Sequence, residues 1–122
     1  MQDYRKLRVW IKAHTHAVNV RRATQRFPRT GYASLKSQIT SAAESIAFNI
    51  VEGCGSSSLK ELARFLDISI KSSSELEYQL VLAKDYGVLS EKAWKELTHV
   101  TIDIRRMLCG LRAKILSSAD QF

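Results

Sequence analysis

Apolar residues recur along the chain at alternating steps of three and four residues, the spacing that places side chains on one face of an α-helix. The longest regular run lies in the last third of the chain. There, every position but one on the expected buried face, called a core-type position below, is apolar. Its positions are Trp94, Leu97, Thr101, Ile104, Leu108, Leu111 and Ile115. Such a run predicts an amphipathic helix with one buried face.

Three earlier segments repeat this spacing. Their core-type positions are Trp10, Ala13, Ala17, Val20, Thr24 and Phe27 in the first, Leu35, Ile39, Ala42, Ile46, Asn49 and Gly53 in the second, and Leu59, Leu62, Leu66, Ser69, Ser73, Leu76, Leu80 and Ala83 in the third. The pattern therefore predicts four helices that share one periodicity.

The expected helix ends follow from residues that stop or cap a helix. Pro28 and Gly31 end the first helix, because the residue before a proline is disfavoured in the α conformation and glycine tolerates a left-handed turn. Ser58 and Glu61 form the pattern of a capping box, in which each side chain accepts a hydrogen bond from the other residue's N–H. Gly87 ends the third helix. The predicted helices span about 4–27, 33–53, 58–86 and 90–117.

These ranges leave short connections, which force neighbouring helices to run antiparallel. We therefore predict an all-α fold, an antiparallel up-down-up-down four-helix bundle, as a single domain over 1–122. One proline and five glycines in 122 residues agree with long helices and argue against a many-turned β-sandwich or barrel.

Polar residues also occupy core-type positions of the predicted helices. They are Thr24, Asn49, Ser69, Ser73 and Thr101. In one interpretation the small hydroxyls bond back to their own helix while Asn49 fixes the alignment of the helices. In the other they line a polar pocket with a function. The pattern favours the first.

The net charge of +7 is concentrated at the start of the chain. Residues 1–30 hold eight Lys or Arg residues and one acid, Asp3, so the remaining 92 residues sum to zero. Arg5, Arg8, Lys12, Arg22 and Arg26 lie opposite the apolar face of the first predicted helix, and Arg29 follows it. Such a stripe can contact several phosphates of RNA or DNA.

A solvated helix surface explains the same charges without a nucleic acid, and no aromatic stacking platform is evident from the sequence. A second group of basic residues on the last predicted helix is a candidate extension of the stripe, although Glu96 and Asp103 dilute it. Its members are Arg105, Arg106, Arg112 and Lys114.

Other functional classes find little support. His14, His16 and His99 lack the spacing of a metal site and are expected on the surface or at its boundary, and Cys54 and Cys109 are too few for a disulfide framework. No nucleophile, base and orienting group recur at usable spacing, so we expect neither an enzyme nor a cofactor. The charged first twenty residues predict no signal peptide or membrane span, hence a cytoplasmic protein.

Several apolar residues fall outside the four predicted core faces. They are Tyr4, Val9, Ile11, Val18, Phe48, Val51, Val81, Val100, Ile102 and Met107. A single bundle core cannot bury all of them, and leftover apolar surface is typical of an interface. The alternative is a wide core face that absorbs them. The first interpretation predicts self-association.

An ordered set of short motifs between about residues 3 and 89 resembles a known family. The motifs are Leu7-Arg8-Val9-Trp10 with Lys12-Ala13, Phe27-Pro28, Leu35 with Gln38, Ser45-Ile46 with Asn49-Ile50, Glu52-Gly53, Phe65-Leu66, and Glu75-Leu76-Glu77 with Gln79-Leu80. Together they resemble the bacterial four-helix-bundle family named for the 23S rRNA intervening-sequence protein, also called S23.

The resemblance implies a small helical bundle that assembles into a ring-like homopentamer and has no established enzymatic activity. It also implies distant relatives that assist reverse transcriptases and bind nucleic acid. Asn49, Glu52 and Gly53 belong to the shared motifs, and Glu52 is expected to bond to backbone or to a neighbouring helix. Family members usually carry basic residues where this chain has Thr40, Ser41 and Ser56, so nucleic-acid contacts would rest on other residues.

Two functions are therefore compared below. The first is a non-enzymatic, ring-forming protein that binds RNA or DNA through the basic residues near the N-terminus. The second is a homo-oligomeric scaffold that holds another protein without binding nucleic acid.

Overall fold

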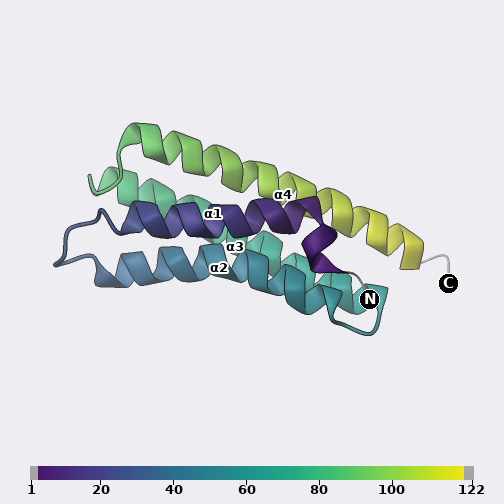
Figure 1. The fold of residues 1–122 in the computed structure, drawn as a ribbon. Helices are drawn as coiled ribbons and strands as arrows, with labels where there is room; N and C mark the ends of the chain where they lie inside the picture. The colour runs from purple at the N-terminus through teal and green to yellow at the C-terminus, as the bar shows by residue number, and fades with distance from the viewer. Residues whose placement is uncertain (1–2, 120–122) are drawn as a thin grey trace.

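The chain forms four consecutive α-helices in a computed structural model that describes residues 3–119 (Figure 1). The helices are α1 (Arg8–Thr24), α2 (Ala33–Cys54), α3 (Leu59–Asp85) and α4 (Glu91–Ala119), and a short 3₁₀ helix, η1 (Tyr4–Lys6), precedes them. Residues 1–2 and 120–122, which the predicted domain range includes, lie outside the described part.

Each helix packs against the next, and α1 also packs against α4, which closes the bundle. Figure 1 shows the α1–α2 and α3–α4 connections at one end and the α2–α3 connection at the other. The predicted all-α, up-down-up-down arrangement is therefore confirmed, and the described residues contain no strand.

The core consists mainly of aliphatic residues that the three-four spacing selected, together with buried residues beside those positions such as Ile50. Leu66, Leu76, Ile104 and Leu108 are completely inaccessible to solvent, as are Ile39 and Ile50 on α2. Burial of such a side chain contributes about 1.5–3 kcal/mol relative to leaving it exposed. The same spacing thus accounts for both the helices and their main stabilising contacts.

The α2–α3 interface contains small residues that let the two helices approach closely. Ser69 is fully buried, and its Oγ donates to the Ile46 carbonyl oxygen of α2 at 2.9 Å. Ser45 and Ser72 hydroxyls also meet across this interface at 2.8 Å. The prediction that core hydroxyls bond only to their own helix is therefore wrong for Ser69, which satisfies a carbonyl of the neighbouring helix.

The other core hydroxyls do bond back to their own helix. Thr24 donates to the Arg21 carbonyl oxygen at 2.8 Å, Ser73 donates to that of Ile70 at 2.6 Å, and Thr101 donates to that of Leu97 at 2.8 Å. These bonds satisfy hydroxyl protons that would otherwise be buried without a partner, which would cost about 1–3 kcal/mol each.

The first predicted helix, 4–27, is interrupted at its start and ends earlier than expected. Leu7 adopts an extended conformation (φ −81°, ψ 123°), which separates η1 from α1, and α1 ends at Thr24. Asp3 caps η1 by accepting from the Arg5 N–H. Tyr4 then packs edge-on against Trp10 with ring centroids 4.9 Å apart. This local capping and aromatic contact compete with a continuous helix, and the periodicity did not reveal them.

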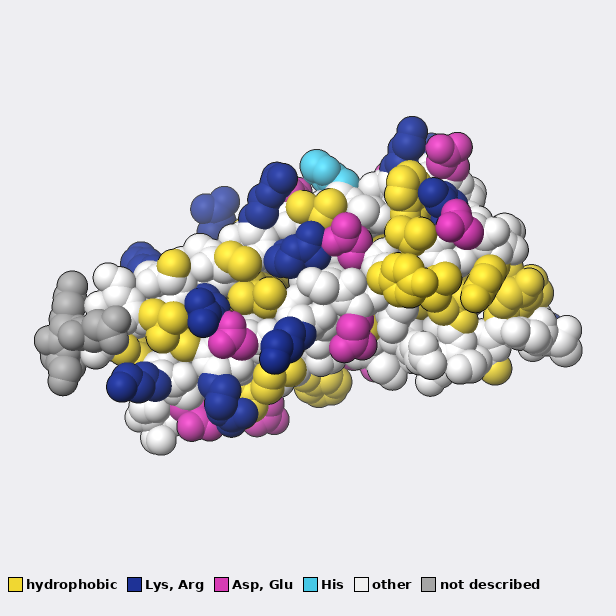
Figure 2. Space-filling view, turned by 180° about the vertical axis from the view of Figure 1, so that it is seen from behind, with side chains coloured by type: hydrophobic (Ala, Val, Ile, Leu, Met, Phe, Trp, Pro, Cys, Tyr) yellow, Lys and Arg dark blue, Asp and Glu magenta, His cyan; other side chains and the backbone are white. Residues whose placement is uncertain are grey.

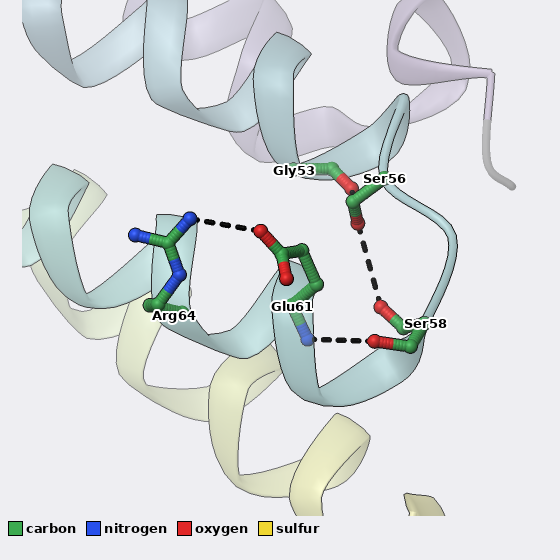
Figure 3. A network of polar contacts seen from close by, with 5 residues as sticks. All are labelled: Gly53, Ser56, Ser58, Glu61 and Arg64. Atoms are coloured by element: carbon green, nitrogen blue, oxygen red, sulfur yellow. Dashed lines mark hydrogen bonds and ion pairs between the residues drawn. The ribbon is translucent and has the colours of Figure 1, made fainter.

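The start of α3 follows half of the predicted capping box (Figure 3). The Ser58 Oγ accepts from the Glu61 N–H at 3.1 Å. The Glu61 carboxylate does not return to Ser58, because it accepts from Arg64 Nη2 at 2.8 Å instead. Ser56 reinforces the preceding turn by donating to the Gly53 carbonyl oxygen. At the other bundle end, Gly87 has the predicted left-handed conformation, with φ of 79°.

No helix in the described part of the chain is both long and apolar enough to cross a membrane. All four carry charged residues along their exposed faces, as the amphipathic pattern requires.

Candidate nucleic-acid interface

The basic residues predicted to bind nucleic acid do not form one continuous helical stripe. Arg5 lies in η1, whereas Arg8, Lys12 and Arg22 lie on α1. Arg26 and Arg29 lie beyond the end of α1, in its connection to α2. The break at Leu7 and the early end of α1 therefore divide the predicted stripe into three parts.

Two of these six residues are held by carboxylates. Arg5 Nε donates to the Asp3 Oδ1 at 3.0 Å, and this hydrogen bond lowers the pKa of the Asp3 carboxyl. Lys12 Nζ lies 3.5 Å from the Asp103 Oδ2 of α4. Asp103 also lies 3.3 Å from the Nε2 of His99, so it has two basic neighbours. Arg5 and Lys12 are therefore less available to a phosphate than the sequence indicated.

The other four residues, Arg8, Arg22, Arg26 and Arg29, are exposed, and none forms an ion pair with a residue in the range 3–119. Each guanidinium presents a fork of N–H donors that matches the oxygens of a phosphate. These four arginines, named here the free arginines, are the part of the predicted site that the structure leaves open to an anion.

A groove runs between α1 and α4 beside the free arginines. One hollow of about 480 Å³ is lined by Arg8, Lys12 and Val100, among others. A second of about 400 Å³ is lined by Arg22, Arg26 and Glu96, among others. His16 and Asn19 border both hollows, so the two adjoin along α1. Three of the free arginines, Arg8, Arg22 and Arg26, thus lie along one concave surface between α1 and α4.

His16 lies beneath this groove and joins α1 to α4. It is 2% exposed, and its Nε2 lies 2.8 Å from the Thr101 Oγ1. Thr101 donates its hydroxyl proton to the Leu97 carbonyl oxygen. In the His16–Thr101 hydrogen bond, therefore, the His16 Nε2–H is the donor and the Thr101 Oγ1 accepts. Burial, with a smaller contribution from the Lys12 cation, lowers the pKa of His16 to about 4. His16 is therefore neutral at pH 7.

The expectation that all three histidines lie at the surface or its boundary is wrong for His16. The buried row of α1 contains Val9, Ala13, His16 and Val20, whereas Trp10 and Ala17 lie at its edge and are only partly buried. The core face is thus rotated by about half a residue step, roughly 50°, from the predicted one, and Ala13 and Val20 belong to both. His14 is exposed and stacks on Trp10 with ring centroids 5.1 Å apart.

The basic residues of α4 extend the candidate interface less than predicted. Arg105 Nη2 pairs with the Glu77 Oε1 of α3 at 2.7 Å, and Arg112 pairs with Asp67 of the same helix. These ion pairs connect α3 to α4. Figure 2 shows the face opposite that of Figure 1, where Lys and Arg side chains lie interspersed with Asp and Glu. This face therefore carries no extended basic patch.

The motif residues Asn49, Glu52 and Gly53 lie toward the C-terminal end of α2, away from the α1–α2 connection with Arg29. Asn49 Nδ2 donates to the Ser45 carbonyl oxygen at 2.8 Å and to its Oγ at 3.0 Å, so it bonds within α2. The predicted cross-helix role of Asn49 belongs to Ser45, which contacts Ser72 of α3.

The Glu52 side chain is exposed and makes no hydrogen bond or ion pair with the described residues, contrary to the expected bond to backbone or a neighbouring helix. Gly53 is buried against α3. A Cβ at Gly53 would lie 2.7 Å from the Leu62 Cδ1 and 3.1 Å from the Phe65 Cβ. Gly53 therefore has a packing role, because it permits the close approach of α2 and α3.

Part of the leftover apolar surface forms a groove between α1 and α2. Phe48 is 64% exposed and Val18 is 39% exposed. With Trp10, Ala47 and neighbouring residues they line a hollow of about 400 Å³. Val9, by contrast, joins the core, and most of the other residues outside the predicted faces are partly buried. The wide core face thus absorbs many of these residues but leaves Ile11, Val18 and Phe48 exposed.

Two tyrosines form an aromatic pair that the sequence reasoning missed. The ring centroids of Tyr32 and Tyr86 are 6.5 Å apart, although 54 positions separate them in the chain. The predicted helix ranges were sufficient to predict that these two tyrosines lie near each other. Tyr32 precedes the second helix and Tyr86 ends the third, and antiparallel packing places these two points at the same end of the bundle.

Within residues 3–119, no group of three or more His, Cys, Asp or Glu side chains is placed to hold a metal ion. The His99–Asp103 contact and the exposed His14 involve no further ligand of this kind.

Comparison with protein families gives one match over most of the chain. A family model described as 23S rRNA-intervening sequence protein matches residues 5–110. This match confirms the resemblance drawn from the motifs and extends it beyond residue 89 into α4. A comparison with curated proteins finds no match.

A solved structure shares the fold. It is a crystal structure of a protein with unknown function from the S23 ribosomal protein family of Bacteroides thetaiotaomicron. The two chains superpose with a TM-score of 0.81 at 21% sequence identity, and the match covers 86% of this chain and 95% of the other.

Proposed function

The chain belongs to the family of 23S rRNA-intervening sequence proteins, and from this premise we propose that it is a non-enzymatic, self-associating cytoplasmic protein that binds RNA or DNA. The observation that carries the proposal is the set of free arginines, Arg8, Arg22, Arg26 and Arg29. Their charges have no acidic partner among the described residues, and three of them border the α1–α4 groove.

Phosphate contacts follow from this arrangement. Each Arg–phosphate contact releases a counterion condensed on the nucleic acid, so binding strengthens as the salt concentration falls. Contacts to phosphates carry no sequence information, so we expect affinity for many sequences. The family name refers to an insertion in 23S rRNA, which makes RNA the first ligand to test.

A gel mobility-shift assay at about 50 mM salt tests the proposal, because phosphate contacts are strong there. Replacing Arg22 and Arg26 by Glu is expected to weaken binding of labelled RNA and DNA by roughly tenfold or more, uniformly across sequences. Replacing Lys60 and Lys71 by Glu makes the same change in net charge on α3, which does not pack against α1, and serves as the control. It should leave most of the affinity intact.

Absence of a shift with the unmodified protein at this salt concentration would overturn the proposal. An equal loss of binding in both double variants would show that only net charge matters and would remove the α1 assignment.

Self-association is the second part of the proposal, and the resemblance specifies a pentameric ring. The exposed Phe48 and Val18 in the α1–α2 groove support it, because contiguous apolar surface in a bundle is typical of an interface. Light scattering on a sizing column should give a mass of about five copies of the 13.8 kDa chain. A monomer at micromolar concentration would contradict the ring.

The alternative function is a scaffold that holds another protein and does not bind nucleic acid. The pairing of Arg5, Lys12, Arg105 and Arg112 with carboxylates favours it, since these pairs reduce the basic surface. Under this alternative, the Arg22→Glu, Arg26→Glu protein would keep its co-purifying protein partners. Loss of those partners together with nucleic acid would count against the scaffold.

A further inference from the structure

A pair of tyrosines, Tyr86 exposed and Tyr32 partly buried against the core, occupies the bundle end that carries the α1–α2 and α3–α4 connections (Figure 1). The rings of Tyr32 and Tyr86 lie 6.5 Å apart at an angle of 43°, and Tyr86 is 56% exposed. Figure 2 shows apolar side chains gathered at this end of the α3–α4 face. Tyr86 therefore offers open ring surface at this end of the bundle, with the partly buried Tyr32 beside it.

Local backbone structure sets the position of both rings. Gly31, with φ of 93°, turns the chain just before Tyr32, the residue that precedes α2. Gly87, with φ of 79°, turns it just after Tyr86, where α3 ends. Only glycine adopts these left-handed angles readily. Each tyrosine is thus fixed at a helix end next to a sharp turn.

Two exposed basic residues, Arg29 and Lys36, lie within four positions of Tyr32 in the chain. Arg29 is three residues before Tyr32, so their Cα atoms are within about 11 Å of each other. Lys36 lies one helical turn after Tyr32, and its backbone N–H donates to the Tyr32 carbonyl oxygen at 3.0 Å. Lys36 also lines a hollow together with Arg21 of α1. Asp85, the acid next to Tyr86, is 3.7 Å from the Lys84 Nζ.

We propose that Tyr32, Tyr86 and Arg29 form a binding site for single-stranded nucleic acid, in which an unpaired base stacks on Tyr86 while Arg29 and Lys36 contact the adjoining phosphates. This inference rests on the proposed function and specifies the form of the ligand. The bases of a duplex are already stacked, whereas an unpaired base can lie against an aromatic ring. The site is therefore expected to distinguish single strands from duplexes, but not one base sequence from another.

Fluorescence anisotropy with a labelled 12-nucleotide RNA, single-stranded and annealed to its complement, tests this site at about 50 mM salt, with a DNA strand of the same sequence as a further arm. The unmodified protein is expected to bind the single strand more tightly than the duplex. Tyr86→Ala should weaken single-strand binding about tenfold and leave duplex binding unchanged. Tyr86→Trp restores a stacking surface and should restore the affinity.

Tyr78→Ala is the matched control, because Tyr78 is 62% exposed on the same helix, two turns earlier, without an aromatic partner among the described residues. It should bind like the unmodified protein. Equal affinity for both strand forms, or no effect of Tyr86→Ala while Arg22→Glu, Arg26→Glu still weakens binding, would overturn the stacking site and leave the proposed function intact. No binding of either strand form would overturn both.

Discussion

Acidification from pH 7 to pH 4 is expected to lower the free energy of unfolding of the bundle by roughly 3 kcal/mol through His16 alone. His16 is buried as the neutral imidazole, with its pKa lowered from 6.5 to about 4. Above pH 6.5 the group is neutral in both the folded and the unfolded chain, so its full contribution is present. Between pH 6.5 and pH 4 the unfolded chain binds the proton first, and stability falls.

Urea unfolding followed by circular dichroism at a series of pH values measures this effect. His16→Gln keeps an N–H donor near the Thr101 Oγ1 and removes the titration, so its stability should depend less on pH between 6.5 and 4. His99→Gln is the control, because the His99 side chain is 76% exposed and should leave the steep pH dependence in place. If the free energy of unfolding falls equally with pH in the unmodified and His16→Gln proteins, His16 is not the group whose protonation destabilises the bundle.

Two glycine substitutions in helices are expected to change stability in opposite directions. Gly53→Val should lower the free energy of unfolding by about 2–3 kcal/mol, because even its Cβ would lie 3.1 Å from the Phe65 Cβ and 2.7 Å from the Leu62 Cδ1, and valine adds two methyl groups to that Cβ. Gly110→Ala on α4 should raise it by about 0.5–1 kcal/mol. No described atom lies within 4 Å of a Cβ at Gly110, so only the gain in helix propensity remains.

Thermal or urea unfolding of the two variants provides the comparison. If α2 and α3 separate easily, Gly53→Val will unfold like the unmodified protein, and the close approach of these helices will not be a source of stability. A loss of stability in Gly110→Ala would show that the exposed face of α4 is covered by a further contact.

The helices could be predicted because their causes are local. The three-four spacing sets the buried faces, and residues such as Ser58 and Gly87 act within one turn of a helix end. The break at Leu7 could not be predicted from spacing, because it results from the Asp3 cap and the Tyr4–Trp10 contact. The rotation of α1 that buries His16 depends on its partner, Thr101, 85 positions away.

The candidate interface was harder to predict because ion pairs join distant parts of the chain. Counting charges locates the basic residues near the N-terminus but does not show that Lys12 meets Asp103 across the α1–α4 boundary. Likewise, Arg105 is neutralised only by a residue of α3, Glu77. Of the six basic residues predicted to bind nucleic acid, the four free arginines remain when those with carboxylate partners are set aside. These ion pairs and the Tyr32–Tyr86 contact can be recognised only in the packed bundle.

The dependence of nucleic-acid affinity on salt concentration tests the central claim, contact between the free arginines and phosphates, most directly. For four phosphate contacts to a single strand, a plot of the logarithm of the association constant against the logarithm of the salt concentration should have a slope of about −3. The double variant Arg22→Gln, Arg26→Gln keeps two of these contacts, so its slope should be about −1.5. An affinity that does not change with salt, or an unchanged slope in the double variant, would contradict the claim.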